Sequence, residues 1–350
     1  MKFNSLQFGK AMSAALFVLL LSVAGMKNAL AQNQVATLQH GEEMSAYYGM
    51  NALVEAHAAA IDGDVITLSS GTFAKTDITK AITLHGAGCA ADTLGNMPTL
   101  ISGGFSINVP NDSIYLIIEG IFFQNDITYR NNLYYAKFIK CRLNNLLMDG
   151  WARMFRDVQF VNCMIDGYAV IWSDNYSVSF INCAIASLKH SIIWYGTAQT
   201  STCVHVYNSI IGQLDTRNTN NIPSGFNLYN SIIGPNYRNV QVSDSYAYNC
   251  IEIDTVFSSS VLMYNCMRVN SYSDVFESFD GTFSQNADYH LKEEIVTSFL
   301  GNDGREVGIY GGAMPYDPRP SYLILNRCNV ANRSTIDGKL SVDIEVIISE

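Results

Sequence analysis

Charged residues are scarce in this chain of 350 residues. Lys, Arg, Asp and Glu make up 15% of it, against about 25% in an ordinary soluble domain. Proline is also rare, with 7 residues and no proline-rich stretch that would mark a linker. The chain is nevertheless 48% hydrophobic and contains 20 Tyr, which excludes intrinsic disorder because ample apolar surface offsets the chain entropy. The acidic balance, a formal charge of −10, excludes a nucleic-acid binder that works by bulk charge.

Long apolar runs are absent except at the N-terminus. There, Lys2 and Lys10 precede an apolar stretch at 14–23, and a small-residue cleavage site follows at 29–31 (ALA). This order predicts a secretory signal peptide over residues 1–31. No later stretch reaches the roughly 18 apolar residues of a membrane-spanning helix. The mature chain is therefore expected without a transmembrane segment, in the periplasm, at the cell surface or outside the cell.

Removal of the signal peptide makes the net charge of the chain more negative. It takes away three of the 21 basic residues and none of the 31 acidic ones, which changes the net charge from −10 to −13. A chain with this charge repels polyanions at long range. Acidic polymers are thus less favoured as partners than neutral ones.

A short phrase recurs seven times in the middle of the chain, built on a Cys or Ser that an Asn precedes in six copies and Lys140 in the first. The copies are 138–143 (FIKCRL), 160–165 (FVNCMI), 180–185 (FINCAI), 206–211 (VYNSII), 228–233 (LYNSII), 247–252 (AYNCIE) and 263–268 (MYNCMR). The Cys or Ser positions are 16 to 26 residues apart. Apolar residues alternate around a break at the Asn, which is the period of a β-strand and not of a helix. Two short strands and a corner about every 20 residues predict the coils of a parallel β-solenoid.

Each position of the phrase should form a row along the solenoid, because neighbouring coils lie about 4.8 Å apart. The Asn residues predict a ladder of corner amides, each hydrogen-bonded to the next coil. This ladder would satisfy corner backbone that is otherwise buried without a partner. The Cys and Ser row is expected to face inward as small packed side chains. A disulfide between Cys163 and Cys183 is the alternative. The spacing offers no metal-ligand pattern such as C-x-x-C.

Two segments are expected to cover the open ends of the solenoid. Residues 44–60 suit a short amphipathic helix, which places an N-terminal cap at 32–60. The coils are then assigned to 61–312, and a final β segment to 313–350. Alternating strands at 321–348 with a turn at Asp337-Gly338 predict a β-hairpin over the last coil.

The ends of the repeat region also carry a family resemblance. Gly63-Asp64, 71–73 (GTF) and 82–86 (ITLHG) form the opening formula, and 307–312 (VGIYGG) follows an Asp288-Tyr-His-Leu ending. With the Asn-Cys coils between them, these segments resemble the right-handed parallel β-helix proteins of the pectate-lyase-like group, in their secreted bacterial form. The resemblance implies an all-β, right-handed solenoid. It implies no single activity, because the group includes lyases, hydrolases, epimerases and non-catalytic surface proteins.

Catalytic motifs of that group are missing. The sequence lacks the Asn-Thr-Asp, paired Asp, Gly-His-Gly and Arg-Ile-Lys motifs that the resemblance would imply for a polygalacturonase. The strongest polar pair is Glu252 and Arg268, which replace aliphatic residues at one position of two successive coils. A buried or end-coil charge pair is one interpretation. A lyase site is a second, with Arg268 as base and Glu252 positioning a uronate or Ca²⁺. A shift of register that turns both side chains outward is a third. No cofactor is otherwise expected.

Aromatic residues form two candidate rows. Trp151, Trp172 and Trp194 occupy similar places in three consecutive coils. The second row comprises Tyr207, Tyr229, Tyr248 and Tyr264, each directly before the corner Asn. Flat aromatic faces with nearby polar groups suit sugars. Packing inside the solenoid is the alternative for the Trp row, and packing against a side loop for the Tyr row.

These observations favour a secreted or cell-surface β-helix protein that contacts glycans or another surface through its aromatic rows without catalysis. A polysaccharide lyase acting on uronate polymers is the first alternative. A purely structural or adhesive surface protein is the second. Partners of the nucleic-acid class are not expected.

Overall fold

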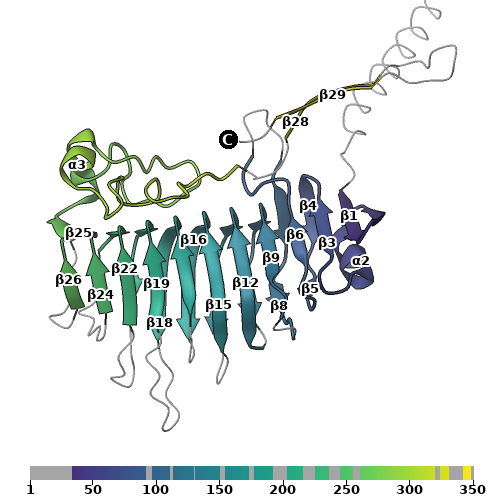
Figure 1. Cartoon of the computed structure of the whole chain (residues 1–350), viewed down its shortest axis with the longest axis horizontal. Coiled ribbons are helices and arrows are strands. Elements are labelled where there is room, and N and C mark those ends of the chain that lie inside the picture. The colour runs from purple at the N-terminus through teal and green to yellow at the C-terminus, as the bar shows by residue number, and fades with distance from the viewer. Residues whose placement is uncertain are drawn as a thin grey trace, which may run out of the picture.

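The repeated phrase folds as predicted into the coils of a parallel β-solenoid (Figure 1). The structure is a computed structural model that describes residues 34–91, 97–110, 113–129, 131–149, 154–172, 177–191, 203–215, 225–235, 245–254, 261–319, 324–330 and 342–347. The predicted signal peptide at 1–31 lies outside these residues. Within them, no helix is long and apolar enough to cross a membrane.

Two long sheets form the sides of the solenoid. Sheet A runs in the order β2-β1-β3-β6-β9-β12-β15-β17-β19-β22-β24-β26. Its members are β1 (Val35–His40), β2 (Glu43–Tyr48), β3 (Val65–Leu68), β6 (Thr83–His85), β9 (Leu116–Glu119), β12 (Leu133–Ile139), β15 (Phe155–Val161), β17 (Val178–Ile181), β19 (Cys203–Tyr207), β22 (Gly225–Tyr229), β24 (Ser245–Tyr248) and β26 (Val261–Tyr264). All pairs from β3 onward are parallel, which is the pattern of coils stacked in one direction.

The strands of sheet B come directly after the corner in each coil. Its main path contains β4 (Gly71–Ala74), β7 (Thr99–Ser102), β10 (Phe122–Phe123), β13 (Arg142–Leu143), β16 (Met164–Trp172), β18 (Ala184–Ser191), β20 (Ile210–Ile211), β23 (Ile232–Ile233), β25 (Ile251–Ile253) and β27 (Met267–Val269). The shorter strands β5 (Asp77–Ile78), β8 (Phe105–Ile107), β11 (Ile127–Tyr129), β14 (Leu146–Asp149) and β21 (Leu214–Asp215) pair beside this path. These pairs are parallel throughout.

The corner between the two sheets explains the repeated Asn. Asn162, Asn182, Asn208, Asn230, Asn249 and Asn265 all have φ between 46° and 54°. This left-handed region is strained for most side chains but is accessible to Asn and Gly. The same corner is Gly120, with φ 67°, in an earlier coil. The sequence repeat is therefore a repeat of backbone geometry.

The predicted amide ladder forms only in the last coils. Asn265 Nδ2 donates to Asn249 Oδ1 at 2.6 Å, and Asn249 Nδ2 to Asn230 Oδ1 at 3.4 Å. Nearer the N-terminus the prediction was wrong. There, Asn182 Nδ2 donates to the carbonyls of Ile309 and Gly311 instead, because a later part of the chain lies across that corner.

Inside the solenoid, the rows pack as predicted. Phe138, Phe160 and Phe180 stack with centroids 4.8 and 5.0 Å apart. Cys163 and Cys183 carry free thiols and are not bridged. Both are fully buried, and each thiol donates to backbone carbonyls.

From β18 to β23, the rows that contain the Ile-Ile pairs of sheet B are apolar on both faces. Ile211 and Ile233 face the interior, whereas Ile210 and Ile232 belong to a second core outside the sheet. Strands buried on both faces lose the usual alternation of apolar and polar residues. The second core is completed by residues from after the last coil, such as Phe276, Leu291 and Val307.

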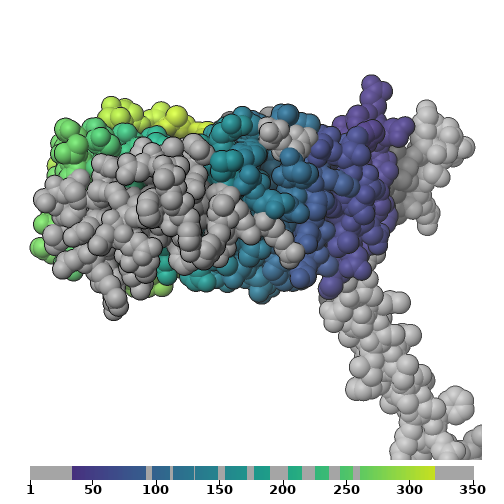
Figure 2. All heavy atoms as spheres, turned by 90° about the horizontal axis from the view of Figure 1, so that it is seen from below, coloured from purple at the N-terminus to yellow at the C-terminus, as the bar shows by residue number. Residues whose placement is uncertain are grey.

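That covering segment, residues 270–319, is called the strap here. It contains the short helices η1 (Tyr272–Asp274) and α3 (Glu293–Ser298). Figure 1 shows it running back above the coils, and in Figure 2 its yellow-green part lies along one side of the stack. The parallel strands among the described residues end at Val269, before the coil boundary expected at 312.

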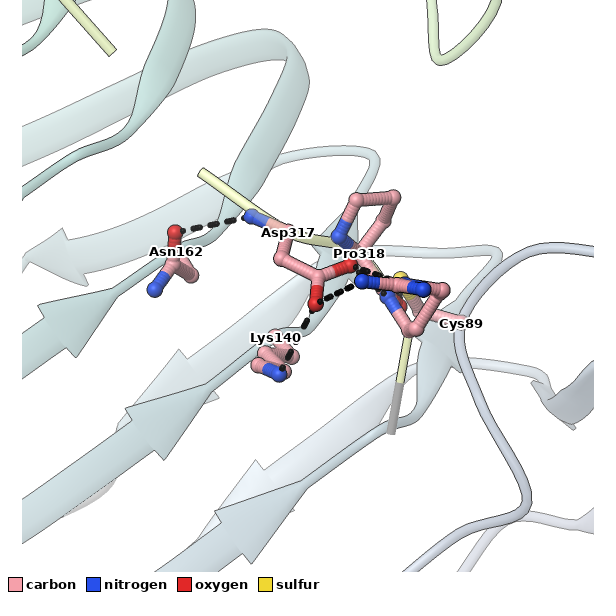
Figure 3. Close-up of polar contacts among 6 residues, drawn as sticks. Cys89, Lys140, Asn162, Asp317 and Pro318 are labelled. Carbon is pink, nitrogen blue, oxygen red and sulfur yellow. Dashed lines mark hydrogen bonds and ion pairs between the residues drawn. The ribbon is translucent and has the colours of Figure 1, made fainter. Parts of the chain in front are cut away.

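The strap ends beside early coils. The Asp317 amide donates to Asn162 Oδ1 at 3.2 Å, and the Asp317 carboxylate lies 3.7 Å from Lys140 Nζ (Figure 3). The Pro318 carbonyl accepts from the Cys89 thiol at 4.0 Å. These contacts fix the direction of the strap, from the last coil back towards the first ones.

The two predicted terminal segments differ from expectation in part. Residues 44–48 belong to strand β2, and the helix α2 is shorter, at Ala52–Ala59. It buries Ala52, Leu53 and Ala56 in the main core. At the other end β28 (Ile324–Val330) and β29 (Val342–Ile347) pair as an antiparallel hairpin. This hairpin follows a strap that has left the last coil, so its placement over that coil was wrong.

Candidate functional site

The predicted Trp row cannot be placed in full. Trp151 and Trp194 lie outside the described residues, and Trp172 is described only as the last residue of strand β16. Asp166, which lies on the same strand as Trp172, forms an ion pair with Arg142 at 2.7 Å. The Trp row therefore stays a prediction.

Glu252 and Arg268 are neighbours, as predicted. They pair in register on β25 and β27, the last two strands of sheet B. Glu252 is 2% exposed and occupies the row of interior Ile residues, whereas Arg268 lies on an edge strand and is exposed. One Glu252 oxygen, Oε1, has no hydrogen-bond partner among the described residues. Burial raises the pKa of Glu252 to about 7, with a further rise from Cys266 and an opposing effect of Arg268.

This position does not resemble a site that meets a polymer. The carboxyl occupies the row of interior Ile residues, and Glu252 does not line the cavity between the last coils and the strap. A general acid or base must reach the proton that it moves. The pair is best described as a charged end of an apolar row.

The Tyr row forms a continuous outward stack on sheet A. Ring centroids are 5.0 Å apart for Tyr207 and Tyr229, 5.1 Å for Tyr229 and Tyr248, and 4.7 Å for Tyr248 and Tyr264. The interplanar angles are 9°, 2° and 7°. The spacing equals that of the coils, because each ring occupies the same place in its strand. We call these four residues the tyrosine ladder.

The ladder leaves ring edges open rather than ring faces. Rings about 5 Å apart in parallel planes cover each other, so no sugar ring can enter between them. Tyr264 is different, because β26 is the last strand of sheet A and no further ring of the described residues stacks on its outer face. Its side chain is 48% exposed. The ladder therefore offers one aromatic face at its end and a strip of edges along its length.

A second outward row lies beside the ladder and is also uncharged. It contains His205, Asn227, Tyr246 and Leu262, which pair in register from β19 to β26. Burial lowers the pKa of His205, which favours the neutral imidazole at pH 7. Tyr246 is 38% exposed and Leu262 49%. Together with the corner Asn residues, the two rows form a neutral, partly aromatic surface on the last four coils.

A cavity of about 560 Å³ lies between the last coils and the strap. Its lining includes Asp254, Tyr272, Glu277, Phe279, Asp280 and Lys292. The cavity was not predicted from the sequence, although the wall that carries Asp254 belongs to the predicted coils. Its other wall comes from the strap, and no sequence repeat indicates where the strap lies.

Much of this lining has a structural role already. The Tyr272 hydroxyl donates to the Gly212 carbonyl at 3.2 Å. The Asp280 carboxylate accepts the Thr282 amide at 2.8 Å, which lowers the pKa of Asp280. No group of three or more His, Cys, Asp or Glu side chains is arranged to hold a metal ion within the described part of the chain.

The structure therefore assembles the four predicted tyrosines into one stack on sheet A. It also places Glu252 next to Arg268, but on sheet B. Comparisons with protein-family models, with curated proteins and with solved structures found no match for this chain.

Proposed function

We propose that this chain is an exported, non-catalytic binding protein that holds an extended, neutral polysaccharide along the outer face of sheet A. The observation that carries the proposal is the tyrosine ladder, four parallel rings at the spacing of the coils on an outward face. Export rests on the predicted signal peptide at 1–31.

The shape of the surface favours a linear polymer. A straight row of equivalent side chains repeats every coil, and an extended chain of β-linked sugars repeats at a comparable distance per ring. One sugar unit per coil would then meet the same tyrosine edge each time. Amphipathic tyrosine side chains contact ligands at low entropic cost, because few bonds must be immobilised. A helical or branched glycan would leave this register after one or two units.

The charge of the surface favours a neutral polymer. The described residues of the ladder and of the row beside it include no acidic or basic group that is charged at pH 7. The mature chain carries about −13 overall, so a uronate polymer would be repelled. The lyase alternative needs a cationic base in a groove, and Arg268 with Glu252 supplies none. Binding without turnover is thus the activity that the geometry supports best.

The experiment is a binding assay of the mature chain on a panel of polysaccharides. Neutral β-1,4-linked polymers should bind, whereas polygalacturonate and α-linked glucans should not. Tyr264→Ala and Tyr246→Ala should each weaken binding by about tenfold, as expected for aromatic anchors. Tyr115→Ala is the matched control, because Tyr115 is 40% exposed but lies before β9, far from the ladder. Absence of binding to every polysaccharide would leave a structural role instead.

A further inference from the structure

The Cys row contains two groups of thiols in different surroundings. Cys141, Cys163 and Cys183 follow one another in three coils, and all are 0% exposed. Ser209 and Ser231 occupy the next two coils in the same row. Cys250 and Cys266 then resume the row in the last two coils, where Cys250 is buried and Cys266 is half-buried.

The last pair shares one rung of the solenoid. Tyr248 pairs with Tyr264 before the two cysteines, and Ile251 pairs with Met267 after them. The Met267 amide donates to the Cys250 carbonyl at 2.9 Å, which holds the two backbones side by side. Parallel neighbours lie about 4.8 Å apart, within the roughly 4.4–6.8 Å between Cα atoms that a disulfide spans.

The Cys266 thiol reaches across to the neighbouring coil, where it donates to the Ala247 carbonyl at 3.4 Å. The neighbouring Cys250 lowers the pKa of Cys266 to about 6. Burial raises the pKa of Cys250 well above its usual range. Cys266 is thus the thiolate that can attack, and Cys250 is the thiol beside it that can resolve the product.

We propose that Cys250 and Cys266 form a redox-active pair that closes to a disulfide on exposure to an external disulfide, and so staples the last coil to the one before it. The Cys266 thiolate attacks one sulfur of the oxidant, forms a mixed disulfide and releases one thiol. The Cys250 sulfur, after loss of its proton to solvent, attacks the Cys266 sulfur and releases the second thiol. Two protein thiols are oxidised and one external disulfide is reduced to two thiols.

The other cysteines of the row supply an internal control. Cys163 and Cys183 have the same rung geometry, but both are sealed inside the stack and burial raises the pKa of Cys163 well above its usual range. No small oxidant reaches them while the coils are folded. Accessibility at the end of the solenoid, and not the repeat itself, makes Cys250 and Cys266 reactive.

The test treats the folded mature chain with oxidised glutathione, blocks free thiols in denaturant and maps disulfides by mass spectrometry. The expected product is a Cys250–Cys266 peptide pair that has lost two hydrogen atoms, while Cys163 and Cys183 are blocked as free thiols. Cys250→Ser should instead trap glutathione on Cys266. Serine occupies this row at 209 and 231, so the variant is expected to fold.

Two results would overturn the proposal. One is a wild-type chain in which Cys266 stays reduced or keeps its glutathione. The other is oxidation of Cys163 and Cys183 at the same rate as the end pair. A supporting second measurement is the melting temperature, which should rise on oxidation of the wild type and stay unchanged in Cys266→Ser.

Discussion

The outer faces of the two sheets are built from the same repeated phrase but differ in how far they are buried. On sheet B, the outward residues of the later coils are aliphatic and are buried by the strap, as for Ile210 and Ile232. On sheet A, the residue before the corner in the last four coils is a tyrosine that remains partly exposed, as for Tyr229 and Tyr264. The difference shows that the chain covers one face with its own C-terminal segment, whereas the tyrosines of the other face stay partly exposed among the described residues.

The largest expected effect comes from the covered face. Ile232→Ala should destabilise the fold by about 2–5 kcal/mol, the usual range for a fully buried Ile. Ile232 is 0% exposed and packs beneath Gly308 of the strap. Chemical denaturation of the purified chain gives the change in the free energy of unfolding.

Ile233→Ala is the matched control in the same coil, because Ile233 faces the interior and is also 0% exposed. The two variants should lose similar stability. A much smaller loss for Ile232→Ala would mean that the strap adds little to the fold, and the contrast between the two outer faces would fail.

The next effect tests how closely the strap approaches sheet B. Gly212→Ala should cost about 1–3 kcal/mol, because a Cβ there would overlap the Phe283 ring and the Ala186 carbonyl. Gly104→Ala is the control, since nothing lies within 4 Å of its Cβ position. Thermal unfolding of both variants measures the difference. Equal melting temperatures would contradict a tightly seated strap.

A third test concerns the inner face of sheet B, where Glu252 is the buried acidic side chain. The Glu252 pKa is raised to about 7, above its ordinary value of 4.5. The folded state therefore keeps a proton that the unfolded state loses. The resulting stabilisation is complete below about pH 4.5 and disappears as the pH rises through about 7. Glu252→Gln should remove this slope and add about 1–2 kcal/mol at pH 8 relative to wild type.

The readout is denaturant unfolding at pH 5 and pH 8 for both proteins. The stability difference between Glu252→Gln and wild type should be larger at pH 8. A difference that is equal at the two pH values would show that Glu252 is ionised and paired with Arg268 throughout, as in a surface ion pair.

Local repeats made much of this fold predictable from the sequence. The Asn corner, the inward Cys row and the outward Tyr row follow from a phrase whose backbone and burial recur in every coil. The strap could not be predicted in the same way, because its residues do not repeat and their contacts lie far away in sequence. Asn182 illustrates the limit, since its amide was expected to bind the next coil and binds Ile309 instead. The cavity beside Asp254 was missed for the same reason.

The smallest expected effect lies on the open face, in the coil that also carries Ile232. Tyr229→Ala removes two ring stacks, with Tyr207 at 5.0 Å and Tyr248 at 5.1 Å. Stacked pairs contribute about 0.5–1.5 kcal/mol each, so the loss should be about 1–2 kcal/mol, smaller than that of Ile232→Ala. Denaturant unfolding measures both variants under one condition. If Tyr229→Ala lowered the free energy of unfolding as much as Ile232→Ala, the ladder would act as part of the core. The tyrosines would then hold the coils together rather than bind a polysaccharide.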